Sequence, residues 1–156
     1  MFMLALFLAS AALLADPAPS PWTYFEGAWS CEGAFLPSNR PLASDIAFRV
    51  DPRSGALVKD HLDRPPGRYA ATETWAQAPD GKTYRAGIAS NGGMRWYRSE
   101  GWIGDQWVWT RLRDAAEPEE AFAFIRQDPA TMVVEWRISR NGAPMVVGDR
   151  LTCRKA

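Results

Sequence analysis

The segment "EGAWSCEG", residues 26–33, decides the fold because glycines and large or reactive side chains alternate along it. Every second position of an extended strand faces the same way. The residues that share one such face are Gly27, Trp29, Cys31 and Gly33. Glycines on either side of a tryptophan are expected where a strand bends at a barrel corner and the tryptophan plugs one end. We therefore expect Gly27 and Trp29 to open the first strand of a closed β-barrel.

Turn signals punctuate the rest of the chain about every ten to twelve residues, as in an all-β meander. They include "APDGK" and "RNGAP", whose Asp-Gly and Asn-Gly pairs favour tight hairpins. The segments between the turns are expected strands, at residues 27–35, 44–51, 56–63, 69–78, 82–90, 94–102, 106–113, 119–127, 131–139 and 144–154. One stretch, "RLRDAAEPEEAF", is either a turn or a short helix or lid.

Several of these segments alternate between apolar and polar side chains. Ile46, Phe48 and Val50 take one face, for example, while Asp45 and Arg49 take the other. Each such strand buries one face and exposes the other. Hairpin-linked strands of this kind either split into a sandwich or close into a barrel, and closure also removes exposed edges. We expect an all-β fold, an up-and-down antiparallel barrel of about 8–10 strands.

The chain begins with features of export. Residues 1–15, "MFMLALFLASAALLA", are apolar and end in small residues, as the core and cleavage site of a signal peptide do. A membrane anchor is the alternative, but the run is shorter than the ~20 residues that span a bilayer. A Pro-rich, flexible leader follows at residues 16–21, and residues 22–156 fit one domain. We expect a periplasmic or secreted protein with no membrane span after cleavage.

The two cysteines, Cys31 and Cys153, lie near the two ends of the expected domain. In an oxidising compartment an even pair is expected to form a disulfide, whereas two unrelated buried thiols would be expected in the cytosol. The first and last strands of a closed up-and-down barrel are neighbours. Because Cys153 is in phase with Val147 and Leu151, both cysteines take the inward register, and we expect a disulfide at the seam.

Overall charge argues against a nucleic-acid partner. Lys plus Arg and Asp plus Glu both number 18, so no net field attracts a polyanion. The eight tryptophans therefore indicate packing, or stacking against a small molecule.

Gly27-x-Trp29 at the start of an exported meander of this size resembles the calycin superfamily, which includes lipocalins, fatty-acid-binding proteins and nitrobindin-like barrels. "GAWSCEG" is similar to the Gly-x-Trp-x-Gly-x-Gly opening of nitrobindin-like barrels, with Cys31 at the middle glycine. The lipocalin resemblance implies an arginine across the motif tryptophan, but the two candidates, Arg150 and Arg154, are in the outward phase.

A nitrobindin-like barrel would hold haem through a late histidine. The only histidine here, His61, lies on the third expected strand in phase with Lys59 and Asp63, a face that we expect to be solvated. We therefore expect no haem and no other cofactor. No Cys or His spacing suits a zinc site either.

Aromatic and charged residues alternate together on several expected strands, which is what an amphipathic ligand site requires. In "MRWYRSEGW" the tryptophans bracket two charges, and buried charges imply a paired, wet or ligand-filled lumen. The expected ligand-binding residues are Glu73, Trp75, Trp96, Arg98, Glu100, Trp107, Trp109 and Arg111. Tyr69, Trp102, Phe122, Phe124 and Arg126 share these registers. The alternative is that the aromatic residues fill the barrel and the charges pair near its rim.

Catalysis is not expected. The strand neighbours of His61 point to the opposite face, and no serine sits in a nucleophile elbow. Glu73 and Glu100 could act as an acid and base only if their environments separated their pKa values. The leading hypothesis is a barrel that binds a small hydrophobic or amphipathic ligand in its lumen. The alternatives are a lipocalin-like enzyme inhibitor that acts through its leader or a loop, and an envelope protein without a ligand.

Overall fold

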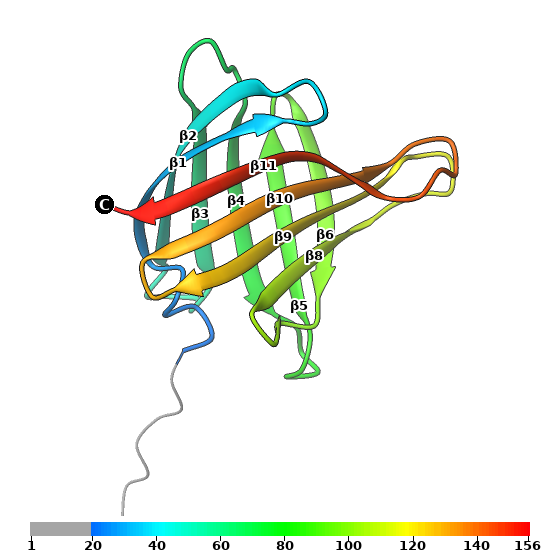
Figure 1. The fold of residues 1–156 in the computed structure, drawn as a ribbon. Coiled ribbons are helices and arrows are strands. Elements are labelled where there is room, and N and C mark those ends of the chain that lie inside the picture. The colour runs from blue at the N-terminus through cyan, green and yellow to red at the C-terminus, as the bar shows by residue number, and fades with distance from the viewer. Residues whose placement is uncertain (1–19) are drawn as a thin grey trace, which may run out of the picture.

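The computed structural model describes residues 20–156 as eleven β-strands and no helix (Figure 1). The strands are β1 (Gly27–Phe35), β2 (Arg40–Val50), β3 (Leu57–Asp63), β4 (Ala70–Gln77), β5 (Tyr84–Ser90), β6 (Gly93–Ser99), β7 (Trp102–Ile103), β8 (Gln106–Leu112), β9 (Glu119–Asp128), β10 (Thr131–Ser139) and β11 (Val146–Lys155). Each long strand pairs antiparallel with its neighbours in the sequence, β11 pairs with β1, and β6 pairs with β8 to close the barrel. The two-residue β7 pairs only with β8. The predicted up-and-down barrel is confirmed.

The strand limits follow the sequence pattern closely. The expected strands at 27–35 and 131–139 coincide with β1 and β10, and the Asp-Gly and Asn-Gly signals lie in hairpin turns. The stretch at residues 111–122 is the end of β8, a turn and the start of β9, so the helix alternative is wrong. The expected signal peptide and residues 16–19 of the leader lie outside the described residues.

The barrel seam joins β1 to β11, and Cys31 faces Cys153 directly across it. The two cysteines form the predicted disulfide, and both are fully buried. Gly33, two residues further along β1, is needed because a Cβ there would stand 1.8 Å from the carbonyl oxygen of Arg150. Gly27 has φ +114°, a conformation that side chains rarely adopt. The glycines of the opening segment therefore permit a turn into the strand and a close approach at the seam.

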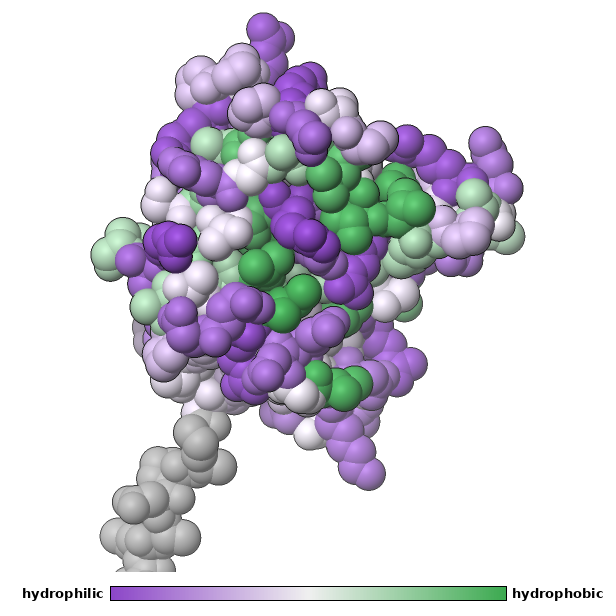
Figure 2. Space-filling model, in the orientation of Figure 1, coloured by the Kyte–Doolittle hydropathy of each residue, from purple (hydrophilic) through white to green (hydrophobic). Residues whose placement is uncertain are grey.

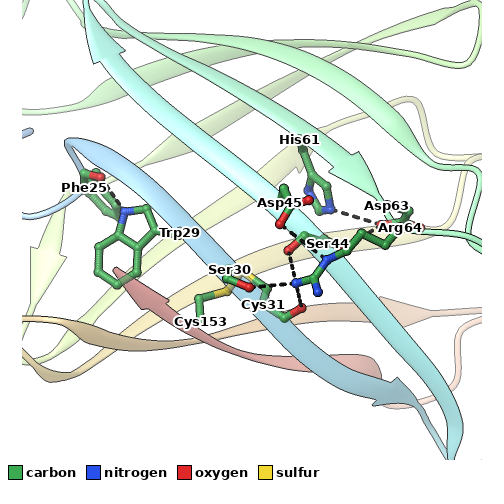
Figure 3. The surroundings of a disulfide bond; sticks show 10 residues. All are labelled: Phe25, Trp29, Ser30, Cys31, Ser44, Asp45, His61, Asp63, Arg64 and Cys153. Atoms are coloured by element: carbon green, nitrogen blue, oxygen red, sulfur yellow. Dashed lines mark hydrogen bonds and ion pairs between the residues drawn. A yellow bond between two sulfur atoms is a disulfide. The ribbon is translucent and has the colours of Figure 1, made fainter. Parts of the chain in front are cut away.

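A side chain from the β3–β4 turn joins β1 to β2 beside the disulfide. The Arg64 guanidinium donates to the Ser30 hydroxyl at 2.7 Å and to the Cys31 carbonyl at 3.3 Å, and its Nε lies 3.4 Å from an Asp45 carboxylate oxygen (Figure 3). This one residue thus bridges β1 and β2 on the outer wall.

Turns alternate between the two ends of the barrel, and the N-terminal segment covers one of them (Figure 1). We call this the closed end. Trp22 and Phe25 are buried there, and the Trp22 indole N–H donates to the Gly55 carbonyl at 3.1 Å. The Trp29 indole N–H donates to the Phe25 carbonyl at 2.7 Å. The segment before β1 therefore folds under the barrel as a plug.

The cation across Trp29 is Lys155, whereas the lipocalin resemblance implies an arginine there. Lys155 lies opposite Trp29 in the β1–β11 register, and its Nζ stands 5.1 Å from the Trp29 ring. The same Nζ donates to the Tyr24 carbonyl at 3.1 Å. Arg150, by contrast, points outward and pairs with Glu135, as its phase predicts.

Aromatic side chains fill the half of the lumen above the plug. Phe25 and Trp75 have ring centroids 5.2 Å apart, and Trp75 stands equally close to Phe124. The rings of this aromatic core belong to Trp22, Phe25, Trp29, Phe48, Trp75, Trp107, Trp109 and Phe124. Large buried apolar areas of this kind supply most of the stability of a small domain.

The outer wall carries most of the charge. Figure 2 shows polar and charged residues over much of the face formed by β1 and β9–β11, with apolar side chains gathered toward its middle. On β10, Glu135 accepts from Arg137 and from Arg150, each at 2.7 Å. Across residues 20–156 there is no helix of the length and apolar character needed to cross a bilayer.

Candidate functional site

The lumen contains a cavity of about 410 Å³ at the end opposite the plug, which we call the open end. Side chains from β1–β6 and β9–β11 line it, so nearly the whole barrel wall contributes. A larger depression of about 920 Å³ lies against the outer wall of β1–β6, where small apolar side chains predominate. We take the lumen cavity as the candidate site because it lies inside the barrel and is lined by six charged residues and four Phe, Tyr or Trp residues, whereas two aspartates and one tryptophan line the outer depression.

The cavity floor is a buried ion pair resting on the aromatic core. The Lys59 ammonium group on β3 bonds Glu73 on β4, and the two residues are 4% and 3% exposed. The second Glu73 oxygen accepts from the Trp75 indole N–H at 2.8 Å, and Lys59 Nζ stands 5.5 Å from the Phe124 ring. Both charges are therefore satisfied by fixed partners, as burial requires.

One wall carries a network on β2 and β3. The Ser44 hydroxyl donates to Asp63 Oδ1 at 2.7 Å, and His61 Nε2 lies 3.3 Å from the same oxygen (Figure 3). Burial lowers the pKa of His61, and the neighbouring Lys59 lowers it further. Burial alone would raise the pKa of Asp63, but the bonds from His61 and Ser44 outweigh it and the pKa is lowered. Near neutral pH the wall thus presents a neutral imidazole beside a carboxylate.

Asp149 on β11 faces the cavity from the opposite side of the seam. It lies across from Phe35 on β1 and Trp136 on β10. Burial, reinforced by the charge of Asp63, raises its pKa to about 6 although the Trp136 backbone bonds its carboxylate. Among the ion pairs of residues 20–156, none includes Asp149.

The remaining charges cluster around Glu120 on β9. Its carboxylate oxygens lie 3.3 Å from Arg111 and 3.8 Å from Arg95, and one accepts from the Trp136 indole N–H at 3.1 Å. The Trp136 ring lies against Gly148, where any added Cβ would stand 2.5 Å from it. Glu120 thus holds Trp136 in place in the cavity wall.

Five of the expected ligand-binding residues lie inside the barrel as predicted, and these are Glu73, Trp75, Trp107, Trp109 and Arg111. Only Glu73 lines the cavity itself. The tryptophans belong to the aromatic core beneath it, and Arg111 reaches it through Glu120.

The expectation that Trp96, Arg98 and Glu100 face the lumen is wrong, because these residues lie on the outside of the barrel. Trp96 is 56% exposed, and the alternate residues of β6, Tyr97 and Ser99, are buried instead. The physical reason lies on β5. Gly87 is the register partner of Trp96 and leaves room for its ring on the outer wall, where a Cβ would stand 2.9 Å from that ring.

Glu100 follows β6 and makes a surface ion pair with Arg98 at 2.6 Å. Gly101, with φ +83°, ends the in-and-out alternation of side chains that runs along β6. Trp102 therefore turns inward and stacks on Phe25, with the two ring centroids 5.1 Å apart. Since Glu73 is buried in the lumen and Glu100 is outside, these carboxyls do not form an acid and base pair.

The prediction of a solvated His61 is also wrong. The face of β3 that carries Lys59, His61 and Asp63 is the lumen face, and the His61 side chain is only 12% exposed. Leu57, fully buried at the start of β3, lies on the same face of the strand, and its hydrophobic side chain was the signal that could have identified this face as the inner one. Leu62, on the opposite face, is 60% exposed, so assigning the inner face of β3 from the hydrophobicity of Leu62 alone gives the wrong side.

Sequence reasoning also missed Asp63, Asp149 and Glu120 as cavity residues. A lone carboxylate on an alternating strand is normally placed outside. Partners on other strands make the inward positions of Asp63 and Glu120 tolerable, whereas Asp149 has no ion pair in residues 20–156 and its pKa is raised by burial. Within the described part of the chain, no group of three or more His, Cys, Asp or Glu side chains is arranged to hold a metal ion. Comparison with known protein families and with curated proteins finds no match to this chain.

Proposed function

We propose that the protein is an exported, calycin-like carrier that binds a small amphipathic molecule in the open end of its lumen. The observation that carries this proposal is the cavity of about 410 Å³ on which aromatic and charged side chains converge. Small-molecule sites commonly measure ~300–1,000 Å³ and combine apolar walls with a few placed polar groups.

The walls of the cavity combine apolar surface with a few polar groups, as a site for an amphipathic molecule requires. Phe35, Phe122 and Trp136 offer apolar surface, whereas His61 and Asp149 offer polar atoms. Because the aromatic core fills the rest of the lumen, a ligand is confined to the open half. The ligand is therefore smaller than a long extended chain that would need the whole barrel.

Binding is favoured over catalysis because the charged groups of the cavity floor are committed to one another. Lys59 and Glu73 bond each other, and Glu120 is surrounded by its own donors. A general acid or base needs a free proton site within reach of substrate. The carboxyl of Asp149 also faces the cavity and is not committed in this way. No ion pair of residues 20–156 links Asp149 to a second acid, base or nucleophile, so we propose binding without a reaction.

Export is supported by the disulfide, since such bonds persist in oxidising compartments. We propose the periplasm or the extracellular space. The inhibitor alternative gives the leader or a loop a partner-binding role. Against a role for the leader, Trp22, where the leader meets the barrel, is 4% exposed and packs inside the closed end. Carriage is thus better supported than inhibition.

A thermal-shift screen of small molecules tests the proposal when a variant whose cavity is filled by a side chain is screened beside the wild type. Ser90→Trp places a large side chain from β5 into the cavity, and Ala89→Trp places the same side chain on the exposed outer face one residue away. Saturating ligand at ~100 times Kd stabilises a protein by ~2.7 kcal/mol, which should raise Tm by about 5 °C or more.

We expect some compounds to stabilise wild type and Ala89→Trp but not Ser90→Trp. If no compound stabilises the wild type, or if the blocked variant responds equally, lumen binding is wrong.

A further inference from the structure

We propose that the lumen ligand is an organic cation, with an ammonium group held between Asp63 and Asp149 and an apolar body against the aromatic wall. This inference rests on the proposed carrier function and names the ligand's chemical class.

The charges that line the cavity do not balance. Two cations, Lys59 and Arg95, stand among four carboxylates, which are Asp63, Glu73, Glu120 and Asp149. Each cation already has a carboxylate partner, Lys59 in Glu73 and Arg95 in Glu120. Two negative groups therefore have no permanently charged partner within the described residues.

These two carboxylates are Asp63 and Asp149. Asp63 accepts a hydrogen bond from Ser44, but its one ion-pair partner in residues 20–156 is His61, which burial keeps neutral near pH 7. Asp149 has no ion pair in the same residues. Both carboxyls line the same cavity, and the charge of Asp63 is one cause of the raised pKa of Asp149. An added positive charge at this place would favour the ionised form of both carboxyls.

The walls around the carboxylates suit an organic rather than an inorganic cation. Phe35 and Trp136 are the direct strand neighbours of Asp149, and the Tyr69 ring packs edge-on against His61 at 5.1 Å. Aromatic faces attract ammonium groups and also accept the apolar body that carries them. Phe122, on β9, completes this wall.

Three probes with one aromatic body isolate the charge. Tryptamine, indole-3-acetate and indole-3-ethanol are cationic, anionic and neutral at pH 7.5, and calorimetric titration measures each without relying on fluorescence. We expect tryptamine to bind at least tenfold more tightly than indole-3-acetate. Hydrogen bonds to charged groups are strong enough to produce such a ratio.

Asp149→Asn should weaken tryptamine binding about tenfold and leave indole-3-ethanol within twofold. Asp60→Asn is the matched control, because Asp60 lies on the exposed outer face of β3 next to His61 and should have no effect. Tryptamine affinity should also fall as the pH drops below about 6, since Asp149 is then protonated.

Equal or tighter binding of indole-3-acetate would overturn the inference, as would no heat with any probe at millimolar concentration. The carrier function and the charge of the ligand are tested by different results. If the screen finds compounds that Ser90→Trp excludes but they are anionic or neutral, the lumen binds ligands and only the charge assignment is wrong.

Discussion

Removal of the seam disulfide should cost the barrel about 5 kcal/mol. The bond between Cys31 and Cys153 closes a loop of 122 residues. In the chain-entropy model a loop of that length restricts the unfolded chain by about 16 cal/mol/K, or about 5 kcal/mol at 25 °C. Small domains are stable by only ~5–15 kcal/mol in total, so the loss would be a large part of the stability.

Urea unfolding, followed by tryptophan fluorescence, measures this cost. The wild type is unfolded and refolded with and without a phosphine reductant, so the two forms have the same sequence and differ only in the disulfide and the two hydrogens that replace it. For a slope near 2 kcal/mol/M, the midpoint should fall by about 2–3 M on reduction. The unfolded reduced chain is also less compact, so the slope itself should rise.

The double variant Cys31→Ala/Cys153→Ala is the matched control, since it has no bond to reduce. Its midpoint should be low and indifferent to the reductant. A reduced wild type that loses less than about 1 kcal/mol would refute the seam cross-link as a major source of stability.

Further substitutions probe the charged groups of the lumen and the close approach at Gly33. Lys59→Met leaves Glu73 charged and buried, and we expect a loss of about 3–5 kcal/mol in urea unfolding. Adding Glu73→Gln to Lys59→Met should recover at least part of the lost free energy of unfolding. A double variant that is less stable than Lys59→Met would contradict the ion-pair account. Asp149→Asn should raise the free energy of unfolding by about 1–3 kcal/mol at pH 7.5, because a pKa of about 6 in the folded state makes ionisation costly above that pH. The gain should fade between pH 6 and pH 4, and a gain that is constant with pH would count against this assignment. Gly33→Ala should cost about 3 kcal/mol or more, since its Cβ would stand 1.8 Å from a backbone oxygen. Gly93→Ala, with its nearest atom 3.7 Å away, should cost about 1 kcal/mol or less, and equal losses would disprove the close approach.

The fold could be predicted because its signals are local. Alternation along β2 and β10, together with turn residues such as those of "APDGK", determines strands and hairpins without any knowledge of distant contacts. The pairing of Cys31 with Cys153 follows from closure, which makes the first and last strands neighbours, together with the inward phase that the two cysteines share.

The phase of β6 could not be predicted because it depends on a neighbouring strand. Trp96 and Tyr97 are adjacent, so each face of the segment offers one large aromatic side chain. Gly87 on β5 decides the outcome by leaving room for Trp96 outside. A single strand read by itself does not contain that information.

The cavity walls escaped prediction for a related reason. Lys59, His61 and Asp63 form a polar face that hydrophobicity places in solvent. Their inward position is tolerated because Glu73 and Ser44, on the two adjacent strands, supply partners. Buried polar networks are properties of strand pairing, and register must be known before they can be recognised.

Native mass spectrometry of the protein purified from an oxidising compartment tests the central claim most directly. Spectra recorded before and after denaturation should show an adduct that unfolding releases, with a mass that identifies the ligand. Ser90→Trp should carry none, while Ala89→Trp should carry the same adduct as the wild type. A wild-type protein found only at its bare mass, two hydrogens light for the disulfide and indistinguishable in occupancy from the blocked variant, would contradict a ligand-carrying lumen.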